Sequence, residues 1–145
     1  MKTILVIHGP NLNLLGEREP EIYGHDTLAE INRELEAAAA ELGWQTDCRQ
    51  SNSETEIVSW LQEERRKVAG VILNPAGLSH TSVVLLDAIL ACQLPVVEVH
   101  LSNLYKREEF RQRSLTARGA VGVISGLGKQ GYLLALRYLV DSLSK

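Results

Sequence analysis

The first stretch with chemically useful side chains is the loop that follows residue 7. Residues 4–7 (ILVI) form a short continuous apolar run, which is typical of a strand buried on both faces. The next helical pattern begins only near Thr27, although such connections in α/β domains usually take about two to six residues. Within this loop Asn11, Arg18 and Tyr23 supply an amide, a guanidinium and a phenol. A long polar loop at the carboxyl end of a strand predicts a ligand site that offers hydrogen bonds and positive charge.

A second group of polar residues comes at or just after the ends of two later apolar runs, residues 68–73 and 95–99. Its members are Asn74, His80, Glu98, His100 and Ser102. Glu98 and His100 are two positions apart on an expected strand, so their side chains point to the same face. We expect both groups to converge, because open parallel sheets bind ligands at the carboxyl ends of their strands.

Each of these residues also has a purely structural explanation. A tyrosine can cover the edge of a core with its hydroxyl in water, and asparagines often only close turns. His80 could cap the helix that begins near Thr81, and Glu98 with His100 could form a satisfied buried pair. The site hypothesis is favoured because the polar groups all follow strands at one edge, whereas the opposite edge offers nothing comparable.

The hydrophobic pattern predicts the elements that position these groups. The expected strands are residues 4–7, 44–50, 68–73, 95–99 and 121–125. The expected helices run from Thr27 to about Leu42, from Ser53 across the next apolar positions, from Thr81 to Cys92, across residues 107–111, and beyond Gly128. This alternation predicts an α/β fold with one doubly wound, five-stranded parallel sheet. Right-handed crossovers favour the strand order 2-1-3-4-5, with a crevice between strands 1 and 3.

Length and composition limit the class of protein. A chain of 145 residues without linkers or repeats suits one domain, residues 1–145. The formal net charge of -3 gives no general attraction to nucleic acid or to anionic membranes. No apolar run is long enough for a membrane span, and Cys48 and Cys92 lack metal-binding spacing. We therefore expect a cytoplasmic protein with two free thiols and no membrane or nucleic-acid partner.

The helix expected after Ser82 is apolar nearly all round. A helix that covers one face of a sheet needs only one apolar stripe, so this helix suggests a second partner surface. Asp87 interrupts the apolar sequence. It is expected either to form a salt bridge or to meet a partner subunit.

Five segments in the same order closely resemble the type II 3-dehydroquinases. They are GPNLNLLGEREPEIYG, NPAGLSHTS, EVHLSN, REEFR and GLGKQGYLLAL, and the resemblance extends over residues 4–143. It implies a flavodoxin-like fold and the dehydration of 3-dehydroquinate to 3-dehydroshikimate in the shikimate or quinate pathway. It also implies that the reaction uses no cofactor and no metal.

The resemblance assigns a set of residues to proton transfer. Tyr23 matches the family's base and His100 its acid, which Glu98 orients. Arg18 matches a mobile-loop arginine beside the tyrosine, and Asn11 matches the amide that holds a water at the developing enolate. A free tyrosine, with a pKa of about 10, is mostly protonated at neutral pH, so a neighbouring guanidinium would be needed to favour the phenolate. Arg107 matches a second arginine near this tyrosine.

A second set is assigned to substrate binding. The side chains expected to hold the ring hydroxyls are those of Asn74, His80, Asp87 and Arg111, and the backbone amides of Leu101 and Ser102 match the carboxylate site. In the family the aspartate reaches the site of a neighbouring subunit in a trimer. The resemblance therefore implies a homododecamer, a tetramer of trimers, with Asp87 at a subunit interface. His8 and the pair Pro75-Ala76 depart from the family's usual residues.

Three other classes of protein remain as alternatives. A Schiff-base dehydratase needs a desolvated lysine, but Lys67 lies at the wrong edge of the sheet, and Lys106 and Lys129 are expected on the surface. A flavodoxin-like phosphoacceptor module would need an aspartate where Asn74 stands. The third alternative is a non-catalytic paralogue, which leaves the polar groups of the first loop unexplained.

Overall fold

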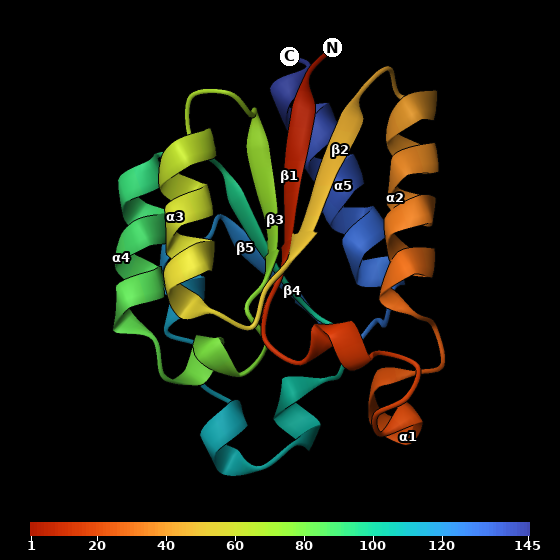
Figure 1. Cartoon of the computed structure of the whole chain (residues 1–145), viewed down its shortest axis with the longest axis vertical. Helices are drawn as coiled ribbons and strands as arrows, with labels where there is room; N and C mark the ends of the chain where they lie inside the picture. The colour runs from red at the N-terminus through yellow and green to blue at the C-terminus, as the bar shows by residue number, and fades with distance from the viewer.

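A computed structural model describes residues 1–145, and its centre is a parallel five-stranded sheet (Figure 1). The strands are β1 (Thr3–His8), β2 (Gln45–Gln50), β3 (Gly70–Asn74), β4 (Val96–His100) and β5 (Gly122–Ser125). Their order is β2-β1-β3-β4-β5 and every neighbouring pair is parallel, so the predicted flavodoxin-like topology is confirmed. The predicted strand 44–50 is confirmed as an edge strand.

Helices cover both faces of this sheet (Figure 1). The helices that do so are α2 (Leu28–Glu41), α3 (Glu54–Glu64), α4 (Val83–Cys92) and α5 (Gln130–Leu143), whereas the short helix α1 (Pro20–Tyr23) lies beyond the carboxyl ends of the strands. Helices α2 and α5 pack together on one face, and α3 and α4 pack on the other. None of these helices combines the length and apolar character needed to cross a membrane.

Strand β1 shows why the apolar runs lie at the centre. Its side chains alternate between the two faces: Ile4 and Val6 pack in the core beneath α2 and α5, whereas Leu5 and Ile7 pack beneath α3 and α4. All four are fully buried. A strand buried on both faces needs apolar residues at every position, which explains the continuous run in the sequence.

Hydroxyl side chains begin three helices at the predicted residues. The hydroxyl oxygens of Thr27, Ser53 and Ser82 accept hydrogen bonds from backbone N–H groups in the first turns of α2, α3 and α4. One predicted helix is wrong. Within residues 107–111 only Glu109–Arg111 is helical, as a 3-10 turn, and none of these three residues is buried, so no apolar face holds a longer helix here.

The loop between β1 and α2 contains structure that the sequence pattern did not predict. A 3-10 turn, Leu12–Leu14, is followed by the short helix α1, which ends in Tyr23. Gly16 and Gly24 on either side of α1 have φ angles of 91° and 86°, which side chains other than glycine rarely adopt. These glycines let the chain leave and re-enter the body of the domain around Tyr23.

The end of β1 approaches the end of β3 so closely that residue 9 must be glycine. The Gly9 N–H donates to the Asn74 carbonyl oxygen at 2.8 Å. A Cβ at position 9 would lie 2.8 Å from the carbonyl carbon and oxygen of Pro75. Because backbone atoms cannot move aside, this contact fixes the spacing between the first two loops of the pocket.

We predict that Gly9→Ala lowers the free energy of unfolding by about 1–3 kcal/mol, because the added methyl group overpacks against backbone atoms. Gly77→Ala is the matched control, since a Cβ there meets nothing within 4 Å and the φ angle is not positive. Urea unfolding followed by circular dichroism measures both changes. Equal stability of the two variants would contradict the close approach.

Candidate active site

A pocket opens at the carboxyl ends of β1, β3 and β4, where the sequence predicted a site. Its lining residues are Pro10, Asn11, Leu12, Arg18, Tyr23, Asn74, Ala76, Gly77, His80, His100, Leu101, Ser102, Leu104, Arg107 and Arg111. Ten of the twelve residues assigned from the sequence pattern or the resemblance line it directly, Arg107 included, and the two that do not are Glu98 and Asp87. No lysine lines the pocket. The predicted convergence of the loops is thus present in the structure.

Tyr23 lies between two guanidinium groups. Arg18 stacks over the tyrosine ring, with its Cζ 4.9 Å from the ring centroid, and the Arg107 Cζ lies 5.4 Å from the same centroid. Only Arg107 reaches the hydroxyl: its Nη2 donates to the Tyr23 oxygen at 3.2 Å. The guanidinium within hydrogen-bonding distance of this oxygen is therefore that of Arg107, whereas Arg18 contacts only the face of the ring.

Arg107 is held in place by a second hydrogen bond. Its Nη1 donates to the Ser102 hydroxyl at 3.0 Å, and its Nε lies 3.6 Å from a Glu108 carboxylate oxygen. The side chain is only 12% exposed. A mostly desolvated guanidinium exerts a stronger field on Tyr23 than a solvated one would.

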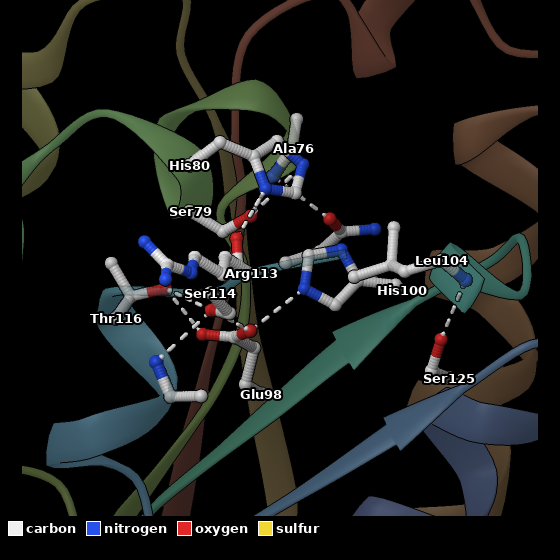
Figure 2. A network of polar contacts seen from close by, with 12 residues as sticks. Ala76, Ser79, His80, Glu98, His100, Leu104, Arg113, Ser114, Thr116 and Ser125 are labelled. Carbon is white, nitrogen blue, oxygen red and sulfur yellow. Dashed lines mark hydrogen bonds and ion pairs between the residues drawn. The ribbon is translucent and has the colours of Figure 1, made fainter. Parts of the chain in front are cut away.

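The predicted pair of Glu98 and His100 is formed at the end of β4 (Figure 2). The His100 Nε2 donates to a Glu98 carboxylate oxygen at 2.7 Å, and both side chains are almost completely buried. Glu98 lies behind His100 and does not line the pocket itself. Since Nε2 is occupied by Glu98, Nδ1 is the ring nitrogen left for a ligand.

Two hydroxyl groups complete the surroundings of the Glu98 carboxylate (Figure 2). Ser114 donates to one oxygen at 2.6 Å, and Thr116 donates to the other. Burial alone would raise the pKa of Glu98, but hydrogen bonds from His100, Ser114 and Thr116, together with the histidine charge, bring it below the usual value. The carboxylate is therefore ionised and can stabilise a positive charge on His100.

His80 lies beside His100 and is not a helix cap. Its Nδ1 donates to the Arg113 carbonyl oxygen at 2.7 Å, and its ring stacks on that of His100 at a centroid distance of 6.5 Å (Figure 2). Ser82 caps the following helix instead. Because a carbonyl oxygen can only accept, the neutral His80 ring keeps its proton on Nδ1 and offers Nε2 as an acceptor.

The remaining lining groups offer hydrogen bonds on several sides of the pocket. The N–H groups of Leu101 and Ser102 donate to no other group of the protein, as expected of a carboxylate site. Asn11 adopts a φ of 71°, and its backbone N–H donates to the Asn52 side chain. The side-chain amide of Asn11 lines the pocket and has no hydrogen-bond partner in the protein. Arg111 lines the pocket while its Nε donates to Glu108 at 2.9 Å.

Asp87 is the one assigned residue that the structure keeps away from this pocket. It lies on the exposed side of α4 and forms no salt bridge within the chain. The explanation of Asp87 as an intramolecular ion-pair partner is therefore wrong. Any role in a site requires a second copy of the chain.

Sequence reasoning missed the segment 113–116 that stands behind both histidines. It supplies the Arg113 carbonyl group to His80 and the hydroxyls of Ser114 and Thr116 to Glu98. The only available signal was the presence of two hydroxyl residues in an otherwise unassigned stretch before β5. No group of three or more His, Cys, Asp or Glu side chains is arranged to hold a metal ion.

The lowered pKa of Glu98 makes part of the stability depend on pH. The stabilisation is complete above about pH 4.3, the ordinary value for an unfolded glutamate, and is lost as the pH falls through the lower folded value. Glu98→Gln removes the ionised carboxylate, so we predict that the free energy of unfolding falls by about 1–3 kcal/mol near pH 7. The difference from wild type should become smaller towards pH 3. Urea unfolding from pH 3 to 7 measures it. Exposed Glu63→Gln is the control, and an equal pH dependence in both variants would refute the prediction.

Comparison with known proteins identifies the family. A family model described as dehydroquinase class II matches residues 2–140. The chain is 52% identical over 145 residues to a 3-dehydroquinate dehydratase of Halothermothrix orenii, covering 100% of this chain and 98% of that protein. It is 51% identical to 3-dehydroquinate dehydratase 2 of Pseudomonas aeruginosa, covering 97% of this chain and 95% of the relative.

Solved structures agree with this result. The type II dehydroquinase of Propionibacterium acnes superimposes with a TM-score of 0.94 at 40% identity, covering 97% of both chains. A 3-dehydroquinate dehydratase-like protein of Bifidobacterium longum gives a TM-score of 0.74 at 30% identity over 100% of both chains. The family match, the strand order and the pocket agree, and the chain belongs to the class II dehydroquinases, a family of hydro-lyases.

Proposed function

We propose that this chain removes water from 3-dehydroquinate to give 3-dehydroshikimate through an enolate intermediate, with residues 1–145 acting as one catalytic domain. The observation that carries the proposal is the presence of two charge-supported proton carriers in one pocket. Tyr23 is hydrogen-bonded to Arg107, and His100 is hydrogen-bonded to ionised Glu98. Membership of the dehydroquinase family supplies the substrate class.

Tyr23 acts as the base in this proposal. The substrate is a β-hydroxy ketone, and its dehydration begins with removal of a proton from the carbon beside the carbonyl group. The phenolate of Tyr23 takes that proton, and the electron pair left on carbon delocalises onto the ketone oxygen as an enolate. Arg107 at 3.2 Å and Arg18 over the ring favour the phenolate before the step.

His100 acts as the acid in the second step. Its imidazolium donates the Nδ1 proton to the departing hydroxyl group while the enolate electrons return to form the conjugated double bond. The carbon–oxygen bond breaks and water leaves. Ionised Glu98, bonded to Nε2 at 2.7 Å, stabilises the imidazolium and holds the ring at one orientation.

The other lining groups hold the substrate and the enolate. Asn11 holds a water molecule at the enolate oxygen, and the free N–H groups of Leu101 and Ser102 bind the substrate carboxylate. The ring hydroxyls are bound by the side chains of Asn74, His80 and Arg111. The loop between Gly16 and Gly24 carries Arg18 and Tyr23, and its closure over the substrate would exclude water.

A second copy of the chain completes this proposal. Asp87 is exposed on α4 beside exposed Val83, Val84 and Leu90. We place this face against a neighbouring subunit, where Asp87 binds a substrate hydroxyl, in trimers that assemble into a homododecamer. Analytical ultracentrifugation tests the assembly: a monomer at assay concentrations would contradict it. We place the enzyme in the cytoplasm because both of its thiols are free, and in the shikimate or quinate pathway because of its family membership.

The direct test mixes purified protein with 3-dehydroquinate and follows the ultraviolet absorbance of the conjugated enone. We predict that the enone forms without added metal or nucleotide. Borohydride added during turnover should trap no covalent adduct, because the mechanism contains no Schiff base. Failure to form the enone would overturn the proposed function, and a trapped adduct would overturn its mechanism.

We predict that Tyr23→Phe lowers kcat by at least about 10²–10⁴-fold, the usual contribution of a positioned acid or base, while substrate binding is retained. Tyr105→Phe is the matched control, because Tyr105 is 75% exposed and lies outside the pocket. Steady-state kinetics and calorimetric titration with substrate measure the two effects. Wild-type turnover in Tyr23→Phe would remove Tyr23 as the base.

A further inference from the structure

A chain of buried polar side chains runs from the pocket into the core beneath α2 and α5. Asn74 at the end of β3 donates from Nδ2 to the Tyr132 hydroxyl oxygen at 3.0 Å, and this oxygen lies 3.0 Å from Nδ1 of His8. The other ring nitrogen of His8, Nε2, lies 2.8 Å from the Asn32 side-chain oxygen. His8 and Tyr132 are completely buried and Asn74 is 2% exposed. The mechanism above uses none of these groups except Asn74.

The direction of every hydrogen bond in this chain follows from one backbone group. The Ala76 N–H can only donate, and it lies 3.0 Å from the Asn74 side chain, so the atom facing it must be the amide oxygen. The Asn74 NH₂ group therefore faces Tyr132, and the Tyr132 oxygen must accept from it. The hydroxyl hydrogen of Tyr132 is then left to be donated to His8.

The same logic fixes the tautomer of His8. Nδ1 must be unprotonated in order to accept from Tyr132, so the ring proton lies on Nε2 and is donated to Asn32. Burial, opposed in part by the bond to Asn32, lowers the pKa of His8 to about 4, which keeps the ring neutral. Each hydrogen bond along the chain thus pairs one donor with one acceptor.

We propose that Tyr132, His8 and Asn32 are positioning residues that lock the Asn74 amide with one N–H directed towards the bound substrate. Of the two hydrogens on Asn74 Nδ2, one is donated to Tyr132 and the other has no partner in the protein. Asn74 lines the pocket, so this second N–H is available to a ligand oxygen. A flipped amide would oppose the N–H of Ala76 and would present an oxygen instead.

The fixed orientation of the Asn74 side-chain amide also determines which kind of ligand group can bind to it. The fixed N–H requires an acceptor, such as the oxygen of a ring hydroxyl, and gives no advantage to a group that can only donate. This step rests on the proposed function for the identity of the substrate. The direction of the hydrogen bonds rests on the structure alone. A purely structural role of the chain would affect stability and leave substrate affinity unchanged.

The first test measures the tautomer of His8 by the ring ¹⁵N chemical shifts of histidine-labelled protein at neutral pH. The expected form is neutral with its proton on Nε2. In Asn74→Asp the carboxylate accepts from Tyr132, so His8 must acquire a proton on Nδ1 to satisfy the tyrosine oxygen. A wild-type ring protonated on Nδ1, or an Asn74→Asp ring still unprotonated there, would overturn the proposal without reference to catalysis.

The second test is kinetic and uses Tyr132→Phe, which keeps the ring and removes the hydroxyl group. The expected result is a rise of about tenfold in KM for 3-dehydroquinate with kcat within about twofold of wild type, because a binding group is misoriented and no proton carrier is touched. Ile89→Val, a core substitution on the opposite face of the sheet, is the control for lost stability and should leave KM unchanged.

Asn32→Leu extends the kinetic test to the far end of the chain. It removes the acceptor of His8 from a half-buried position on α2, and it replaces Tyr132→Phe if that variant fails to fold. The expected result is again a raised KM. Wild-type KM in the folded variants, with catalysis intact in the wild-type enzyme, would overturn the positioning role alone. An inactive wild-type enzyme would overturn the proposed function, but the measurement of the His8 tautomer would still test the directions of the hydrogen bonds.

Discussion

The ionised carboxylate of Glu98 is buried, and the surrounding structure has to offset the free-energy cost of burying this charge. A charge 1% exposed inside a sheet is costly unless it is both paired and hydrogen-bonded. His100 supplies the pairing from the same strand, but the hydroxyls of Ser114 and Thr116 come from a segment much further along the chain. The connection between β4 and β5 is therefore long because it has to return behind β4.

This connection meets the first loop across the pocket. Its early part carries Leu104, Arg107 and Arg111 into the pocket wall, and the first loop brings Arg18 and Tyr23 to the opposite side. The two segments are joined at Tyr23 by a hydrogen bond and a cation–π contact from Arg107, while Arg18 stacks on the same ring from within the first loop. The position of the short helix α1 and the charge environment of the phenol are thus set by the same contacts.

The sequence was sufficient for the parts of the fold that follow from periodicity. Buried strands, hydroxyl caps and the strand order each have a local or topological signal, and they place most of the pocket correctly. Which of the two arginines bonds the Tyr23 hydroxyl had no such signal, because it depends on which guanidinium reaches that oxygen in the folded loops. The hydroxyls of Ser114 and Thr116 were missed for a related reason: their partner, Glu98, is distant in sequence.

Strand β4 alternates two kinds of residue. Val97 and Val99 pack into the core beneath α5, while Glu98 and His100 face the other side with the hydroxyl groups. A shift of one residue in the pairing of β4 would exchange these two sets, placing a charged pair among aliphatic side chains and valines against the donors. The Glu98–His100 pair therefore also favours the native register of β4, since a misaligned sheet would bury a charge away from the groups that solvate it.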